Sequence, residues 1–211
     1  RNRNRPVLAH CRCTDAINMA LDAGVDAILH CAFYDNDGSY RFDQKTADRL
    51  AASEVWLNPT MGLGNANRER LAKIQAERAL TPEEEDRLER STVSGANSLA
   101  QFKALVKAGV KLVGGSDCGW SYYPFGDFQS EIMSLHAAGL SRINAIHAGT
   151  RSPAAALGII DSIGTVEAGK EADLLVVNGD PSVDLECLRN VAAVFKSGNQ
   201  VPTAKERASL G

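Results

Sequence analysis

The chain has 211 residues, of which 44% are hydrophobic, and its 23 basic and 26 acidic residues leave a net charge of -3. A chain of this size and composition can bury a sizeable core, and the near balance of charge argues against nucleic acid or an anionic membrane surface as a partner. A small-molecule substrate is the expectation that remains.

No apolar run approaches the roughly 20 residues of a membrane-spanning helix. The five cysteines form no CxxC pair, and their number is odd. This usage is typical of a reducing compartment and argues against a disulfide framework, so we expect a cytoplasmic protein.

Short apolar strands alternate with amphipathic helices through the first 120 residues, which is the pattern of βα units around a parallel sheet. Thr14 and Asp15 are placed to cap the first helix, and Gly24 to end it. The Ser-Gly-Asn run at 197–199 predicts the turn of a terminal hairpin. The predicted strands are 7–10, 25–30, 55–57, 111–115, 173–177 and 191–195, and the predicted helices are 43–52, 68–78, 82–90, 98–108, 128–138 and 142–157. Residues 62–97 carry many charges and few apolar positions, and we interpret them as a helical insertion over one end of the sheet.

Three residues with metal-binding side chains follow predicted parallel strands. His10 and His30 end successive strands, and Asp117 ends a later one. Parallel strands deliver their last side chains to the same edge, and imidazole and carboxylate groups suit Zn²⁺ and related ions. Each residue alone has a simpler interpretation, as a hydrogen-bonded loop histidine or a helix-capping aspartate. Together, at matched positions, they predict a metal site.

Four motifs in order give the chain a family resemblance. Residues 9–31, with a histidine at each strand end, resemble the fifth and sixth strands of the amidohydrolase superfamily, with imidazolonepropionase-like and prolidase-like members the most similar. The Gly-Gly-Ser-Asp run at 114–117 resembles the end of its eighth strand. Residues 145–158 resemble the next helix, and 164–174 the entry into a small β-sandwich.

The resemblance implies an α/β fold, the C-terminal half of a TIM (β/α)8 barrel with about strands 5–8, followed by remnant strands of a small β-sandwich. It implies a barrel part at 1–160, with the insertion at 62–97, and sandwich strands at 161–211. It also implies that His10 and His30 bind Zn²⁺ or a similar divalent metal, with Asp117 as ligand and general acid or base. The implied reaction is hydrolysis of a C–N bond in a small cyclic amide, imide or dipeptide.

The family's first-strand His-x-His pair and its fourth-strand lysine would lie upstream of Arg1. An alternative is therefore a catalytically incomplete fragment that folds or assembles without turnover. Four of eight barrel strands leave two open edges, so we expect either self-association or a complementing N-terminal half as partner.

Other candidate residues lie near the same face. Arg12 follows His10 by two residues and is placed to bind a substrate carboxylate, although a salt bridge to a loop acid fits equally well. Tyr34, Tyr122 and Tyr123 lie on loops there and are candidates for shaping the substrate pocket, with packing at the solvent side as the other interpretation. His136 and His147 fall within predicted helices and are expected to be packing or surface residues.

Overall fold

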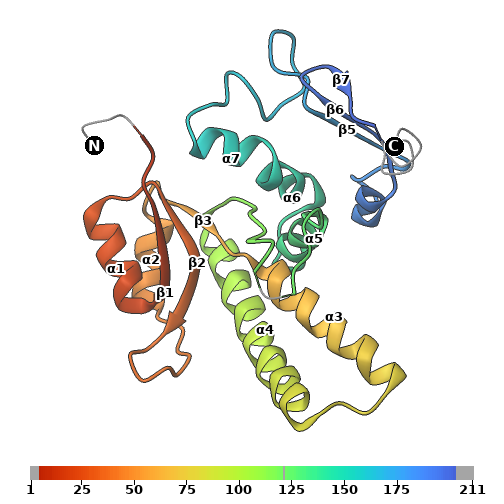
Figure 1. The fold of residues 1–211 in the computed structure, drawn as a ribbon. Coiled ribbons are helices and arrows are strands. Elements are labelled where there is room, and N and C mark those ends of the chain that lie inside the picture. The colour runs from red at the N-terminus through yellow and green to blue at the C-terminus, as the bar shows by residue number, and fades with distance from the viewer. Residues whose placement is uncertain (1–4, 121, 203–211) are drawn as a thin grey trace.

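A computed structural model of the chain describes residues 5–120 and 122–202. It contains a four-stranded sheet with helices beside it, a long helical hairpin, and a separate three-stranded sheet near the C-terminal end (Figure 1). None of the helices in these ranges is long and apolar enough to cross a membrane.

The four-stranded sheet is parallel throughout. Its strands are β1 (Leu8–Cys13), β2 (Ala27–Tyr34), β3 (Trp56–Asn58) and β4 (Lys111–Leu112), and their spatial order follows the chain. Neighbouring strands pair in parallel along the whole series. All four strands therefore point the same way, and their C-terminal ends lie along one edge, as the alternating pattern predicts.

Helices α1 (Thr14–Ala23) and α2 (Gln44–Ala51) lie together beside β1 and β2 (Figure 1). Gly24 ends α1 in the left-handed conformation, as predicted. The predicted cap was wrong, because Cys13 holds the N-cap position and Thr14 is already helical. The extended strand runs directly into the helix, which leaves no turn residue to act as a cap.

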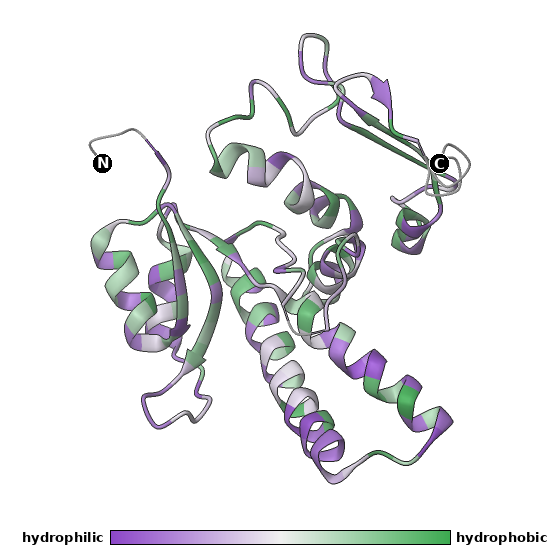
Figure 2. Ribbon diagram, viewed as in Figure 1, coloured by the Kyte–Doolittle hydropathy of each residue, from purple (hydrophilic) through white to green (hydrophobic). Residues whose placement is uncertain are grey.

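Helices α3 (Met61–Glu77) and α4 (Pro82–Ala108) form an antiparallel hairpin that projects from the sheet (Figure 1). The prediction of separate helices at 82–90 and 98–108 was wrong, since α4 is continuous over 27 residues. A capping box of Thr81 and Glu84 starts it and Gly109 ends it, while Gly95 alone does not interrupt it. Figure 2 shows that the start of α4 is hydrophilic and that apolar positions become frequent near the sheet.

The segment 142–157 is also divided differently from the prediction. After α5 (Gln129–Ala137), it forms two helices, α6 (Arg142–Gly149) and α7 (Arg151–Ala156), which meet at Thr150 with φ -134° and ψ -82°. Pro153 follows by three residues, and its ring cannot be accommodated within a continuous helix. The proline is therefore the physical reason for the break.

The second sheet is antiparallel and consists of β5 (Leu174–Val177), β6 (Val191–Lys196) and β7 (Asn199–Gln200), with the 3-10 helix η1 (Leu185–Arg189) before β6. Ser197 and Gly198 join β6 to β7 and both have positive φ, which confirms the predicted hairpin turn.

The core lies where the parallel sheet meets its helices. Its completely buried side chains come from the sheet, α1, α2, α4 and α5: Ile17, Ile28, Cys31, Phe33, Leu50, Leu57, Phe102, Leu105 and Leu135. This packing holds the C-terminal edge of the sheet against the base of the helical hairpin.

Candidate functional site

The two histidines of the sheet lie side by side, but neither is the last residue of its strand. β1 and β2 both extend beyond them, to Cys13 and Tyr34. The regular register reaches Cys11 opposite His30 and then shifts, so that Cys13 pairs with Tyr34. This irregularity lengthens β2 locally, and such bulges commonly re-aim a side chain at a sheet edge.

The imidazole rings of His10 and His30 meet edge to face, with centroids 4.4 Å apart and planes at 66°. Nδ1 of His30 lies 2.7 Å from the hydroxyl of Thr60. That hydroxyl donates its single hydrogen to the carbonyl of Pro59 at 2.7 Å. Both contacts are hydrogen bonds at the same time only when Nδ1–H of His30 donates to this hydroxyl, and in that tautomer the lone pair lies on Nε2.

The surroundings of His30 favour its neutral form. Burial lowers its pKa, and the neighbouring charges of His10 and Arg12 lower it further, while Asp117 acts in the opposite direction. Neutral imidazole is the form that coordinates a metal ion.

Backbone strain is concentrated around these residues. In the two described ranges, five residues other than glycine have positive φ, and one of them, Ser197, belongs to the terminal hairpin. The other four are His30 (65°), Cys31 (48°), Thr60 (53°) and Asp117 (53°). Left-handed backbone is unfavourable for side chains of this size and persists where the surrounding structure imposes it, often at functional sites.

A cavity of about 720 Å³ joins the sheet edge to the helical hairpin. His10, His30 and Asp117 line it from the sheet side, together with Arg12 and Tyr34. The structure thus brings five of the seven candidate residues to one cavity, and Tyr122 and Tyr123 are the two outside it. The guanidinium of Arg12 lies 5.8 Å from the ring centroid of Tyr34, whose hydroxyl is 3.3 Å from the hydroxyl of Ser94 on α4.

Tyr122 lies outside the lining of this cavity. Arg70 stacks on its ring at 3.6 Å, and Arg87 donates a hydrogen bond of 3.1 Å to its hydroxyl. The hydrogen bond from Arg87, together with one from Arg70, lowers the pKa of Tyr122. Tyr123 is buried, and its hydroxyl donates to the carbonyl of Asp127 at 2.5 Å. Tyr122 therefore contacts α3 and α4, Tyr123 contacts the loop before α5, and neither lines the cavity of the histidines.

The residues that the structure brings together suit a divalent transition metal by their chemistry, since two imidazoles and one carboxylate share a cavity wall. In the described part of the chain, however, no three His, Cys, Asp or Glu side chains are arranged so that they could hold one ion. The close approach expected of all three donors is found for the two histidines, and Asp117 does not complete a set.

Arg68 of α3 also lines the cavity, a position that sequence reasoning missed. Its guanidinium donates to the carbonyl of Ser91 at 2.8 Å and to the side chain of Asn65. Burial lowers its pKa, with Glu69 opposing that change. A single arginine within a highly charged helix carries no sequence signal that separates it from the solvated charges around it.

Two histidines and one buried acid lie on α5 and α6, outside the lining of this cavity. Nδ1–H of His136 donates to the carbonyl of Leu140 at 2.7 Å, and neither His136 nor His147 lines the cavity. Glu131 of α5, which sequence reasoning did not single out, is completely buried and its Oε2 accepts from the backbone N–H of Gly62 at 2.7 Å. A lone acid among apolar neighbours in the segment 128–138 was the available signal.

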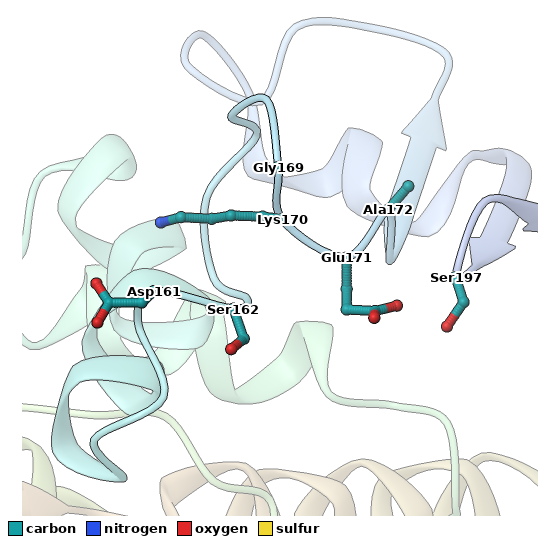
Figure 3. Close-up of a pocket in the computed structure, with 7 residues that line it drawn as sticks. All are labelled: Asp161, Ser162, Gly169, Lys170, Glu171, Ala172 and Ser197. Carbon is teal, nitrogen blue, oxygen red and sulfur yellow. The ribbon is translucent and has the colours of Figure 1, made fainter.

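A second hollow, of about 390 Å³, lies between the segment after α7 and the small sheet (Figure 3). Lys170 extends across it and donates to the hydroxyl of Thr165 at 2.6 Å. Asp161 and Glu171 also line it, without a histidine or a cysteine. It shares no residue with the cavity of the two histidines, which carries the candidate chemistry.

Comparisons with known proteins agree with this architecture. The sequence matches the amidohydrolase family over residues 1–201, so the chain belongs to the amidohydrolase family. The chain is similar to a solved Xaa-Pro dipeptidase with methionine bound in its active site, at 27% identity and a TM-score of 0.73, covering 94% of this chain and 45% of that one. A solved amidohydrolase gives 27% identity, a TM-score of 0.71, and coverage of 95% and 45%.

A prolidase solved with N-methylphosphonate-L-proline matches at 24% identity and a TM-score of 0.67, over 93% of this chain and 45% of that one, and shows the fold alone. No curated protein matches the sequence significantly. The chain spans about half the length of these solved structures. Its parallel sheet therefore corresponds to about half of the amidohydrolase TIM barrel, as the resemblance implied.

Proposed function

We propose that this chain carries part of the metal site of an amidohydrolase that hydrolyses a C–N bond in a small amide-type substrate. The observation that carries the proposal is the pair of adjacent imidazoles, with Nδ1 of His30 committed to Thr60 and Asp117 on the same cavity. His10 and His30 would hold Zn²⁺ or a similar ion, and Asp117 would add a carboxylate.

When bound, such an ion would polarise the substrate carbonyl and lower the pKa of a water molecule toward 7. Asp117 accepts the proton of the attacking water and returns it to the leaving nitrogen, which is the general acid and base role. Its exposed position at the cavity edge leaves it accessible to both groups. The hydroxyl of Thr60 keeps His30 in the tautomer whose Nε2 is free to bind a metal ion.

The charges of the cavity bear on the substrate. Arg12 and Arg68 are its two arginines, and Asp117 is its single acidic residue among the described ones. Arginine binds carboxylates through paired N–H donors, so a substrate with a free carboxylate is favoured. Every unblocked dipeptide meets this condition, whereas a cyclic amide or imide meets it only when its ring carries a carboxylate, and the similarity to the Xaa-Pro dipeptidase supports the choice of a dipeptide. Tyr34 would contact the substrate beside Arg12, whereas a substrate role for Tyr122 would require movement toward the cavity.

A second candidate is a catalytically incomplete chain that folds or assembles without turnover. The observation in its favour is that the described residues supply no group of three metal-binding side chains. Two histidines without a third ligand in place bind zinc weakly compared with a complete site. Zinc binding and hydrolysis together separate the two candidates.

The test measures zinc by titration calorimetry and elemental analysis, and hydrolysis of Xaa-Pro dipeptides by release of proline. We expect His30→Ala to abolish stoichiometric zinc binding, whereas the matched control His136→Ala retains it, because His136 lies outside the cavity. Asp117→Asn should lower any hydrolysis by about 10²- to 10⁴-fold. Zinc binding without hydrolysis supports the incomplete chain, and equal zinc binding by His30→Ala and the parent would refute the metal site.

A further inference from the structure

Glu131 is a buried acid that the proposed chemistry does not use. It lies on α5 with no exposed surface, yet it faces the first turn of α3. Its Oε2 accepts from the backbone N–H of Gly62 at 2.7 Å, and its Oε1 is buried without a hydrogen-bond partner in the described part of the structure. A carboxyl group at this place satisfies a backbone donor that no residue of α3 itself reaches.

The residue before α3 shows why that contact has a wider effect. Thr60 holds the N-cap position with φ 53° and ψ 40°, and its side chain makes no capping hydrogen bond to the helix. Its hydroxyl is instead occupied by the carbonyl of Pro59 and by Nδ1 of His30. A β-branched residue adopts left-handed backbone only where its surroundings impose it. The contact from Glu131 takes the place of the missing cap.

We propose that Glu131 is a positioning residue, which clamps the first turn of α3 so that the Thr60 hydroxyl stays on Nδ1 of His30 and Nε2 keeps its lone pair. The chain of contacts runs from Glu131 to Gly62, along the backbone to Thr60, and from its hydroxyl to His30. The inference rests on the proposed function only for the use of Nε2 as a metal ligand. The tautomer itself is a property of the metal-free chain.

A purely structural cap would predict something different. Loss of the Gly62 contact would then destabilise α3 without changing the protonated nitrogen of His30. Groups beyond the ligand that orient a metal-binding histidine typically change metal affinity by about 10- to 100-fold when they are removed. The two roles therefore differ in the tautomer of His30 and in zinc affinity.

The experiment is long-range ¹H–¹⁵N NMR of the imidazoles in the metal-free chain at pH 8, with zinc titration of the same samples. The chain has only four histidines, so His30 is assigned by comparison with His30→Gln. The variants are Glu131→Ala, Glu131→Gln, Thr60→Val and Thr60→Ser. Ile132→Val is the matched control, because it alters the next buried residue of α5 and leaves the Gly62 contact in place.

We expect a single Nδ1–H tautomer of His30 in the parent chain, Glu131→Gln, Thr60→Ser and the control. Glu131→Ala and Thr60→Val should both give mixed tautomers and bind zinc about 10- to 100-fold more weakly. If Glu131→Ala does not fold, Glu131→Asp carries the same expectation, because the shorter side chain withdraws from Gly62. A folded variant at position 131 that lacks the Gly62 contact but keeps the parent tautomer would overturn the proposal.

Failure of the proposed function gives another pattern. If the parent chain binds no zinc but the tautomer still changes in Glu131→Ala, the positioning role stands and the metal role of His30 is refuted.

Discussion

Substitution of Glu131 by glutamine should change how the stability of the fold depends on pH. Burial raises the pKa of Glu131 from 4.5 to about 7, and the backbone N–H groups of Gly62, Thr60 and Met61 only partly oppose this change. In the unfolded chain the same carboxyl ionises at its usual pKa. Between these two values the folded state holds a proton that the unfolded state has released.

The sign of the effect follows from that difference. Because the folded state binds more protons than the unfolded state between pH 4.5 and about 7, this group lowers the free energy of unfolding as the pH rises through that interval. A difference of about 2.5 pKa units corresponds to roughly 3 kcal/mol, which is lost fully above pH 7. Glutamine has nearly the same shape and does not titrate, so Glu131→Gln should lack this loss.

The assay is urea unfolding of the parent chain and Glu131→Gln at pH 4.5, 6 and 8 and constant ionic strength. We expect the free energy of unfolding of the variant, relative to the parent, to rise by roughly 3 kcal/mol from the lowest pH to the highest. Any constant cost of the amide cancels in this comparison. A flat difference would refute the reasoning, and a difference that falls with pH would mean that the helix α3 holds the carboxylate charged.

Two further predictions concern packing and assembly. In Gly62→Ala the new Cβ would lie 2.6 Å from the hydroxyl of Tyr123, so we expect thermal unfolding to show a free energy of unfolding lower by about 1–3 kcal/mol. In the control Gly64→Ala, on the same helix, the new Cβ would lie 3.4 Å from the Arg68 side chain, and we expect a free energy of unfolding higher by about 0.5–1 kcal/mol. Equal effects of the two substitutions would contradict the packing argument. The strands β1 and β4 are open edges of the described sheet, and Leu8 on β1 is 47% exposed. We therefore expect sedimentation velocity to show either self-association or binding of a separately produced N-terminal half. A stable monomer that binds no such half at micromolar concentration would contradict this prediction.

The sequence predicted the parallel sheet well because its strands are short apolar runs that alternate with helical segments. Gly24 and Gly109 end their helices as their position in the sequence indicates. The helix boundaries within 82–108 and 142–157 were harder to predict from the sequence. In 82–108 a weakly apolar stretch continues one helix, and in 142–157 a proline divides the segment into two helices. Local propensity does not decide such cases, because packing against a neighbouring helix can sustain a polar segment.

The candidate site was predictable to the extent that it depends on strand ends. The rule that parallel strands end along one edge put His10, His30 and Asp117 on one side of the sheet without any knowledge of side-chain contacts, although both strands continue past the histidines. Thr60 and Glu131 were not accessible in this way. The two residues are 71 positions apart in the chain, and they come near each other only when α5 packs against α3.

The left-handed residues explain why the last part of the site escapes sequence reasoning. Thr60 is β-branched and so belongs to a residue type that avoids positive φ, while His30 and Asp117 are types that tolerate it without requiring it, so the local sequence does not predict the backbone that the three adopt. Conflict between local preference and observed backbone is expected where the surrounding fold imposes a particular side-chain direction. At His30 that direction is set by the Thr60 hydroxyl, which in turn depends on the first turn of α3. The orientation of the imidazole is therefore a property of tertiary packing, even though the presence of the imidazole is a property of the strand.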